Sequence, residues 1–327
     1  MATLTVTTLD DETFDGGDLA AETADGGGLS LREAIGLAQD GDVVAFDFSL
    51  SGGSVILTGD TLSILQSITI NGDINGDDVS DIDIAYSASS GTIFAIAGDG
   101  VNFINDHARL DVNSDVFFGG GANAIDVTGN DVTFINRGEL FVDTLDAADG
   151  TEQSTGILYQ GENCTFRNEA GASVISDGRW ALEVGLLNST PATITNFGLL
   201  QGDDDALRFG LGTIVNAGVI RATGEHIVAG RAGLISDGIS VGVVELDFAD
   251  IPETGIVNIE NQATGLIEGV RSGLNINGGG VVNNDGRIVG NESGILISGY
   301  TSIFTGVVAP DVPFSLVNTG EIQAMIR

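Results

Sequence analysis

The sequence predicts an all-β protein, a right-handed parallel β-helix in which short strands stack coil upon coil. Glycine makes up 49 of 327 residues and proline only 4, which is typical of many short strands joined by tight turns. A second observation is a repeated cell, as in Thr213–Ile220, where a strand ends at an asparagine and a glycine leads into the next strand. Third, no helical stretch separates the apolar runs after residue 42, which excludes alternating strand–helix units.

The first residues predict an edge strand and then a capping helix. Residues 3–8 alternate between apolar and polar types and predict a strand, whereas residues 10–28 are rich in Asp and Gly and predict a loop. Ser30 and Glu33 form the pattern of a capping box, and Gly41 would end the helix. Its apolar face would cover the open end of the strand stack and is formed by Leu31, Ala34, Ile35 and Ala38.

Short apolar runs then follow one another to the end of the chain. They predict three strands per coil and about ten coils, beginning with residues 43–46, 54–57, 62–65 and 67–70 and continuing with 92–96, 124–127, 156–159, 181–184, 206–209, 238–241, 273–276 and 294–297. We divide the chain into residues 1–76, the N-terminal cap and first coils, and residues 77–327, the β-helix coils of one continuous domain. Because residues 321–327 lie in the middle of a repeat, we expect that the domain is truncated at its C-terminus.

Each coil is expected to place an asparagine at one corner. The copies are Asn105, Asn136, Asn168, Asn196, Asn216, Asn258, Asn283 and Asn318. The shortest interval, from 196 to 216, is about one bare coil, so longer intervals must contain loops that leave the corners. Asparagine suits a corner because it tolerates a left-handed backbone and because stacked amides can bond one another. The longer connections, residues 77–90, 143–154, 242–255 and 299–314, are expected to form a binding face.

The N-terminal segments 28–35, 41–46, 53–57 and 68–72 carry a resemblance to a known family. They resemble the N-terminal cap of bacterial right-handed parallel β-helix exoproteins of the pectin-lyase-like superfold, known by a Cys-Ser-Leu-Arg-Glu-Ala motif; Leu29 stands here in place of its cysteine. The likeness covers roughly residues 3–76. The remaining coils resemble those of large adhesin-like and repeats-in-toxin secreted proteins. The resemblance implies a secreted or surface-bound rod.

Charge and targeting signals limit the location and the partners. The net charge is −36, and all 11 basic residues are arginine. Such a surface repels nucleic acid and anionic membranes and suits a salty or calcium-rich medium. No apolar run is long enough to insert into a membrane, and the N-terminus lacks a secretory signal. We expect an extracellular or cell-surface protein exported without an N-terminal signal peptide. Cys164 is the only cysteine, which excludes an intramolecular disulfide.

An acidic stretch is a candidate for calcium, the one cofactor that the sequence suggests. Asp73, Asn75, Asp77 and Asp78 could turn several oxygens toward one Ca²⁺ ion. An EF-hand requires Gly and Glu at the sixth and twelfth positions, where this chain has Asp78 and Ile84. The alternatives are therefore a calcium site of another type and a solvated acidic turn.

A second acidic stretch is a candidate for catalysis. Asp203, Asp204 and Asp205 precede His226 by about one coil, and paired carboxylates with a histidine can serve as general acid and base in glycoside hydrolysis. The arrangement resembles polygalacturonase-type β-helix glycosidases, but their Asn-Thr-Asp and Arg-x-Lys motifs are missing. The alternative is a charged corner, because stacking alone produces this spacing. Trp180 could stack on a sugar or pack under a loop.

The leading hypothesis is a non-enzymatic extracellular structural or adhesive rod. It would display loops for binding a partner or a polysaccharide, or would assemble with itself end to end or laterally. One alternative is a polysaccharide-cleaving hydrolase or lyase that uses the Asp203–Asp205 and His226 cluster. A further alternative is a tailspike-like trimer.

Overall fold

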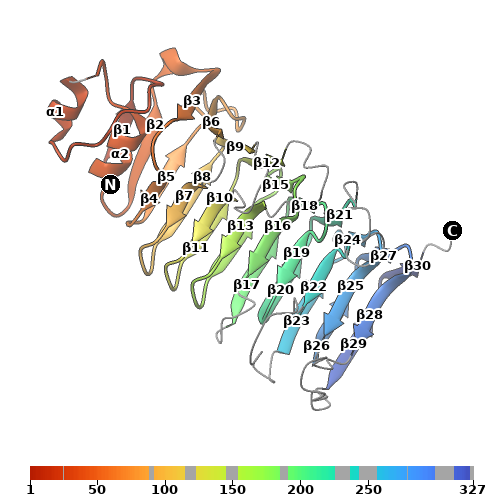
Figure 1. The fold of residues 1–327 in the computed structure, drawn as a ribbon. Coiled ribbons are helices and arrows are strands. Elements are labelled where there is room, and N and C mark those ends of the chain that lie inside the picture. Colours follow the sequence, from red (N-terminus) through yellow and green to blue (C-terminus); the bar gives the residue numbers. More distant parts are fainter. Residues whose placement is uncertain are drawn as a thin grey trace.

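The computed structural model describes residues 1–24, 26–87, 92–114, 123–144, 154–184, 191–224, 236–242, 256–277, 279–298 and 313–324, and structural statements refer to these. The chain forms a rod with its helical cap at the N-terminal end and its coils stacked one after another toward the C-terminus (Figure 1). It is a parallel β-helix, which confirms the predicted fold class.

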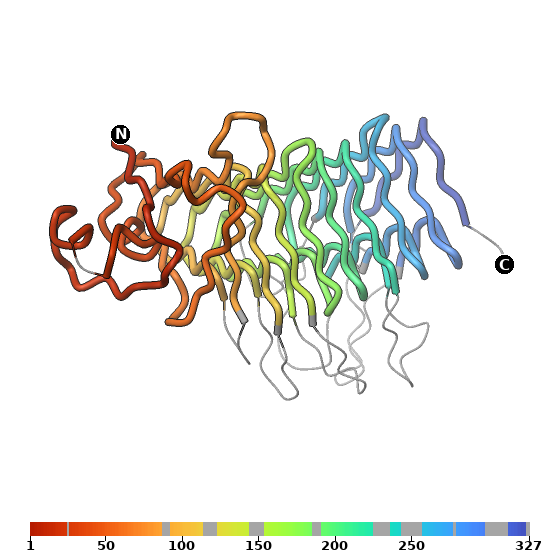
Figure 2. The backbone as a smooth tube through the Cα atoms, turned by 90° about the horizontal axis from the view of Figure 1, so that it is seen from above, coloured from red at the N-terminus to blue at the C-terminus, as the bar shows by residue number. Residues whose placement is uncertain are grey.

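Three sheets run along the rod, and every pairing between neighbouring strands that the structure describes is parallel. Sheet A holds β1 (Thr3–Val6), β2 (Asp42–Phe46), β5 (Ile68–Asn71), β8 (Asn102–Asp106), β11 (Thr133–Asn136), β14 (Thr165–Asn168), β17 (Ala192–Asn196), β20 (Gly212–Asn216), β23 (Ile256–Asn261), β26 (Gly279–Asn284) and β29 (Phe314–Asn318). Sheet B holds β3 (Gly53–Leu57), β6 (Ile82–Ser87), β9 (Arg109–Ser114), β12 (Glu139–Thr144), β15 (Ser173–Ser176), β18 (Leu199–Gly202), β21 (Val219–Ala222), β24 (Leu266–Gly269), β27 (Arg287–Gly290) and β30 (Glu321–Ala324). Sheet C holds β4 (Leu62–Ile64), β7 (Thr92–Ile96), β10 (Asn123–Val127), β13 (Thr155–Tyr159), β16 (Trp180–Val184), β19 (Leu207–Phe209), β22 (Ile239–Val241), β25 (Ser272–Asn277) and β28 (Ser293–Ser298). Neighbours within a sheet are usually three strands apart in sequence, so each coil contributes one strand to every sheet (Figure 2).

The cap closes the N-terminal end of this stack. Helix α2 (Leu31–Leu37) begins with the predicted capping box, in which Ser30 and Glu33 bond each other's backbone N–H groups. Arg32 donates two hydrogen bonds to Asp11, at 2.8 and 3.1 Å, and Asp11 also accepts the N–H groups of Thr58 and Gly59. The arginine of the motif therefore fastens the N-terminal segment to the helix and to the turn before β4.

Two short helical segments differ from the sequence prediction. Helix α1 (Leu19–Ala24) lies in the stretch that we predicted as a loop, and Asp18 accepts the N–H groups of its first turn. A 3₁₀ turn, η1 (Phe48–Leu50), fills the corner between β2 and β3. No helix in the part of the chain that the structure describes is both long and apolar enough to span a membrane.

The core is formed by the inward-facing positions of the three sheets. Its N-terminal half contains an aromatic stack of Phe94, Phe103, Phe134 and Phe166, whose successive ring centroids are 5.3, 5.4 and 5.5 Å apart. Ile194 takes the next position after Phe166 in the register of sheet A, so aliphatic side chains continue the column. Aromatic stacking adds about 0.5–1.5 kcal/mol per pair beyond the burial of apolar area.

A ladder of buried asparagines follows the corner between sheets A and B. Each side-chain Nδ2 donates to the Oδ1 of the next rung, over distances of 2.6 to 3.0 Å, from Asn105 through Asn136, Asn168, Asn196, Asn216, Asn261 and Asn284 to Asn318. Most donating amides also bond a carbonyl within their own corner, as Asn196 does with Gly198 at 3.3 Å, whereas Asn216 bonds the carbonyl of Leu266 in the next coil. The ladder confirms the predicted stacking of amides.

Two rungs differ from the predicted ones. Asn258 is exposed and pairs with Thr213, while the true rung is Asn261; Asn283 is half-buried and pairs with Glu260, while the true rung is Asn284. Because side chains alternate between the two faces of a strand, a shift of one or three residues turns an inward position outward. The predicted left-handed backbone was also wrong: no ladder asparagine is among the described non-glycine residues with positive φ.

Close stacking of the coils explains the glycine that follows most rungs. A Cβ atom on Gly138 would lie 2.2 Å from the carbonyl oxygen of Ala108, and one on Gly218 would lie 2.2 Å from that of Gly198. Neither glycine has a positive φ. Glycine is therefore required here by the neighbouring coil, and not by its conformational freedom.

Candidate functional site on the outer face of sheet C

The chain leaves its regular coil mainly at the two ends of the sheet C strands. From β8 onward, every corner between sheets A and B has only two to four residues, whereas the connection from β21 to β22 spans residues 223–238. Three predicted binding loops, 143–154, 242–255 and 299–314, join to sheet C strands and lie largely outside the described residues. The fourth, 77–90, was wrong in part, because it contains strand β6.

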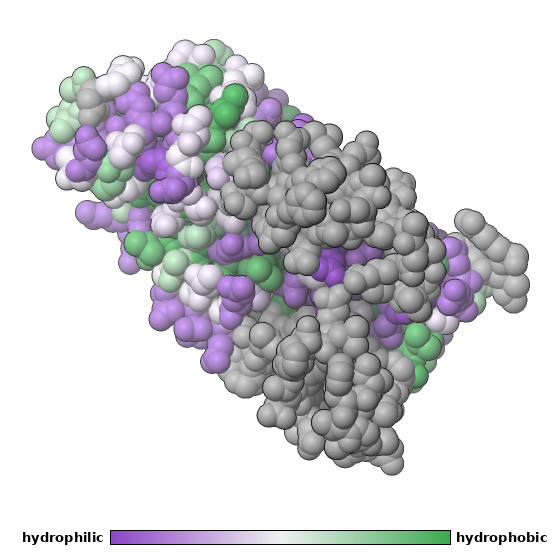
Figure 3. All heavy atoms as spheres, viewed as in Figure 1, coloured by the Kyte–Doolittle hydropathy of each residue, from purple (hydrophilic) through white to green (hydrophobic). Residues whose placement is uncertain are grey.

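The outer face of sheet C carries an unusual column of buried polar side chains. The register places Glu183, Arg208, Ser240 and Asn275 at equivalent positions of consecutive strands. They alternate with inward residues such as Leu207 and Phe209, yet Arg208, Ser240 and Asn275 are at most 7% exposed. Polar side chains that point away from a core are usually solvated, so this column is distinct from an ordinary sheet surface. Apolar and hydrophilic residues are interspersed on the visible part of this face (Figure 3).

Trp180 lies at the start of β16 and is covered by two cations. The guanidinium carbons of Arg179 and Arg208 lie 4.0 and 4.1 Å from the ring centre of Trp180. The side chain is only 7% exposed. These contacts are cation–π interactions worth about 1–2 kcal/mol where solvent is excluded. The ring is therefore packed in this structure and has no open face for a sugar.

The predicted carboxylates lie side by side in the sequence but point to different partners. Asp203 accepts a hydrogen bond from Thr223 at 3.1 Å and is buried. Asp204 is partly exposed and lies 3.4 Å from Arg179. Asp205 is fully buried and accepts the N–H of Asp237 at 2.9 Å. His226 lies outside the described residues, so its position relative to this group stays a prediction.

Asp237 is a functional candidate that sequence reasoning missed. It is fully buried, and Arg271 donates to both of its carboxylate oxygens, while the N–H of Ser272 adds a third bond at 3.1 Å. Aligning the strands 206–209 and 238–241 places Asp237 directly after Asp205 in the stack, as the structure does. The signal was therefore present in the predicted register.

The neighbouring carboxylates change the protonation of Asp205. The pKa of Asp205 is raised from 3.8 to about 7, mainly by burial and then by the charge of Asp237, against the N–H of Asp237 and the charge of Arg208, which lower it. Among the residues that the structure describes, one oxygen, Oδ2, finds no hydrogen-bond partner. The geometry thus holds a carboxyl group that is substantially protonated below neutral pH.

Two further polar atoms in the same region have no hydrogen-bond partner within the described part of the chain. They are Ser240 Oγ and Asn275 Oδ1, both in the outer column of sheet C. Unsatisfied buried groups cost about 1–3 kcal/mol each, and native proteins contain few of them. With Asp205 Oδ2, they are three buried polar atoms without a partner near the strands β19, β22 and β25.

The predicted calcium ligands are only partly brought together. Asp73 and Asp78 lie close to each other and to His107, with ligand atoms from all three within 4.8 Å of one another. Asn75 and Asp77 are not members of that group. Asp81 accepts the N–H groups of Ile74 and Asn75, so part of the acidic stretch serves to fold its own turn.

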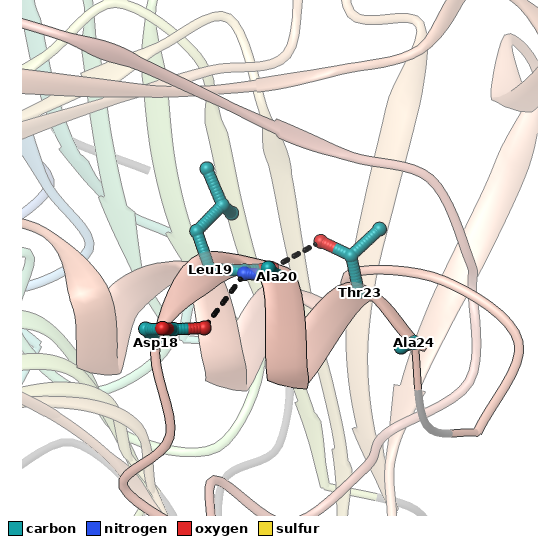
Figure 4. A pocket seen from close by; sticks show the side chains of 5 residues that line it. All are labelled: Asp18, Leu19, Ala20, Thr23 and Ala24. Atoms are coloured by element: carbon teal, nitrogen blue, oxygen red, sulfur yellow. Dashed lines mark hydrogen bonds between the residues drawn. The ribbon is translucent and has the colours of Figure 1, made fainter.

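A surface hollow also lies beside α1, at the opposite end of the rod from the last coil. It is lined by Asp18, Leu19, Ala20, Thr23 and Ala24, whose side chains are small or aliphatic apart from two polar ones (Figure 4). The carboxylate of Asp18 bonds the N–H of Ala20, and the hydroxyl of Thr23 bonds the carbonyl of Leu19. Both polar groups are thus used within the helix.

Comparison of the chain with models of protein families, with curated proteins and with solved structures finds no match. The fold is a parallel β-helix by its own topology, and the resemblance of the cap to secreted exoproteins stays a prediction.

Proposed function

We propose that this protein is a non-enzymatic rod that binds an extended partner, of the neutral polysaccharide type, along the face of sheet C. The observation that carries the proposal is the placement of the long connections. They join both ends of the sheet C strands over many coils, while the corner between sheets A and B stays tight from β8 onward. A row of connections along one sheet of a rigid stack provides an elongated surface, which suits a chain-like ligand.

The charge of the protein supports a neutral ligand. The net charge of −36 opposes the approach of a polyanion at ordinary salt concentration. Among the described residues, two arginines near sheet C are already paired, because Arg179 lies against Asp204 and Arg271 against Asp237. Uncharged hydroxyl groups carry no such penalty and can bond to carboxylates and amides alike.

The connection from β21 to β22 offers the sharpest test. Gly224 and Ser236, which border residues 225–235, lie close together, since a Cβ on Gly224 would be 2.9 Å from Ser236 Oγ. After residues 225–235 are deleted, Gly224 can therefore be joined to Ser236 without stretching the coil. We expect the deletion to weaken binding of neutral polysaccharides at least tenfold in co-sedimentation and glycan-array assays, with an unchanged melting temperature.

The control variant changes a different corner of the same rod. Asp60→Asn, in the turn before β4, alters surface charge outside the long connections and should bind as the parent does. Equal binding by the deletion variant, or no binding of any neutral polysaccharide by the intact chain, would overturn the proposal.

Incubation with the same polysaccharides also decides between binding and cleavage. The deletion removes His226, and Asp205→Asn removes the carboxyl group whose pKa is raised. Each change would abolish a hydrolase or lyase activity that depends on these residues. Release of reducing ends or unsaturated products by the intact chain, with or without calcium, would replace the non-enzymatic proposal. Export to the cell exterior also remains a proposal, supported by the acidic, lysine-free composition. Self-assembly is a further proposal, which light scattering tests.

A further inference from the structure

We propose that Asp73, Asp78 and His107 form a binding site for a divalent transition-metal ion such as Zn²⁺. Ligand atoms of the three side chains lie within 4.8 Å of one another. They come from two consecutive coils, because Asp73 and Asp78 belong to the excursion between β5 and β6, and His107 lies at the next corner. In Figure 2 that excursion, coloured orange, protrudes from the side of the rod.

The two carboxylates retain free coordination positions. Asp73 Oδ1 accepts the N–H groups of Gly76 and Asp77, but Oδ2 accepts only that of Asp78, at 3.0 Å, so one lone pair of Oδ2 remains. Within the described part of the chain, the carboxylate of Asp78 makes no hydrogen bond or ion pair, and the residue is exposed. Two carboxylates held this close repel each other unless a cation lies between them.

The surroundings of His107 are those of a metal-bound imidazole. Its Nδ1 lies 3.3 Å from Asp106 Oδ1, and the same oxygen is 3.1 Å from Arg137. An imidazole whose Nδ1–H is held by a carboxylate presents Nε2 as its ligand, and such outer partners fix the ring in metal sites. This arrangement is independent of the acidic turn, because Asp106 and Arg137 belong to the following coils.

The ligand set selects the class of ion. Ca²⁺ prefers six to eight oxygens, which this group does not provide, whereas Zn²⁺ accepts both imidazole nitrogen and carboxylate oxygen and can bind three protein ligands with water in the fourth position. Zn²⁺ ligand distances of about 2.0–2.2 Å imply ligand separations of roughly 3.5 Å, so the side chains would move together by about an ångström. The ion would then fasten the protruding turn to the next coil.

The chain itself supplies matched controls, since it has only two histidines. Titration of the full chain with ZnCl₂ in about 0.3 M NaCl, which screens nonspecific attraction to the acidic surface, should show one saturable site by calorimetry. His107→Asn, chosen because asparagine tolerates the positive φ of 63° at this position, should weaken Zn²⁺ binding at least tenfold, as should Asp78→Asn. His226→Asn and Asp77→Asn should bind as the parent does.

A second measurement separates a metal site from a simple ion pair. In ¹⁵N-histidine-labelled protein, Zn²⁺ should shift the imidazole signal that His107→Asn removes, and CaCl₂ at the same concentration should not. The proposal is overturned if His107→Asn binds Zn²⁺ like the parent, if no saturable binding occurs, or if Ca²⁺ binds these residues at least as tightly as Zn²⁺.

Discussion

Each rung of the asparagine ladder bonds groups in two neighbouring coils. Asn196 accepts from Asn168, donates to Asn216 at 2.9 Å and also donates to the carbonyl of Val219 at 3.1 Å, all without contact with solvent. A single side chain therefore satisfies polar groups that would otherwise be buried without partners. This makes ladder rungs more sensitive to substitution than their small size suggests.

Asn196→Ala should destabilise the protein by about 3 kcal/mol, because it removes one acceptor of the Asn168 amide and the donor to the buried Oδ1 of Asn216. Chemical denaturation followed by circular dichroism measures the loss. The neighbouring Thr195→Ala, on the outer face of the same strand, should change stability by less than about 0.5 kcal/mol. A loss as small as that of Thr195→Ala would show that the amides are dispensable.

Asp205 predicts a defined dependence of stability on pH. Its pKa is raised from 3.8 to about 7 in the folded protein. The free energy of unfolding is therefore highest, as far as this group is concerned, below about pH 4, where the carboxyl is neutral, and this stabilisation is lost as the pH rises through 7. Asp205→Asn keeps an oxygen that can accept the N–H of Asp237 but cannot ionise. At pH 8 the variant should be more stable than the parent, by an amount on the order of 4 kcal/mol, and at pH 4 the two should be similar. Melting curves between pH 4 and 8 check this, and parallel curves would contradict it.

At the scale of the element, the short corner between sheets A and B sets how closely the coils approach. A methyl group on Gly218 would meet the carbonyl oxygen of Gly198 at 2.2 Å, inside the van der Waals limit. Gly218→Ala should therefore force the coils apart and cost about 2–3 kcal/mol, within the range for overpacking. Ala217→Ser, one residue earlier in the same corner, is the control and should be nearly neutral. Crystal structures or melting temperatures of the two variants distinguish them.

The elements also show how far the sequence could be interpreted. Apolar alternation predicted most strands, and the capping box at Ser30 and Glu33 predicted the start of α2 correctly. The predicted end at Gly41 was wrong, because the helix ends at Leu37 and Ala38 is already extended. The error at Asn258 arose because β23 carries polar residues on both faces: Asn258 and Glu260 point outward and Asn261 points inward. Residue type alone therefore did not show which face is buried. Glycine two residues after the asparagine would have selected Asn284 over Asn283, since Gly286 follows at that interval.

The candidate sites were less accessible to sequence reasoning. His107 lies 34 residues after Asp73, and only the stacking of coils brings the two together. The same holds for Asp205 and Asp237, which are close because β19 pairs with β22. The connections between successive coils differ in length, so spacing in the sequence does not reveal this pairing. Local motifs indicated which acidic residues were candidates. The burial and the bonding partners of these residues depend on the neighbouring coils, which local motifs do not show.

For the whole molecule, charge predicts a response to salt. With a net charge of −36, self-repulsion opposes the compact rod at low ionic strength. The melting temperature should rise by several degrees between about 0.01 and 0.5 M NaCl, as the Debye length falls from roughly 30 Å to less than 8 Å. Differential scanning calorimetry at pH 8 measures the rise. A flat or falling curve would show that the ion pairs, and not the repulsion, dominate the electrostatic free energy.

The asparagine ladder also gives the rod a direction. All the amide groups point the same way: Asn105 Oδ1 has no partner beneath the first rung, where the register places Ile70, and the Nδ2 groups face the following coil. The amide dipoles therefore add from end to end, and each bond polarises the next one. The row behaves like a single long dipole inside an apolar tube, negative near the cap and positive toward the last coil. Removing a central rung would divide it into two shorter dipoles and weaken bonds several coils away.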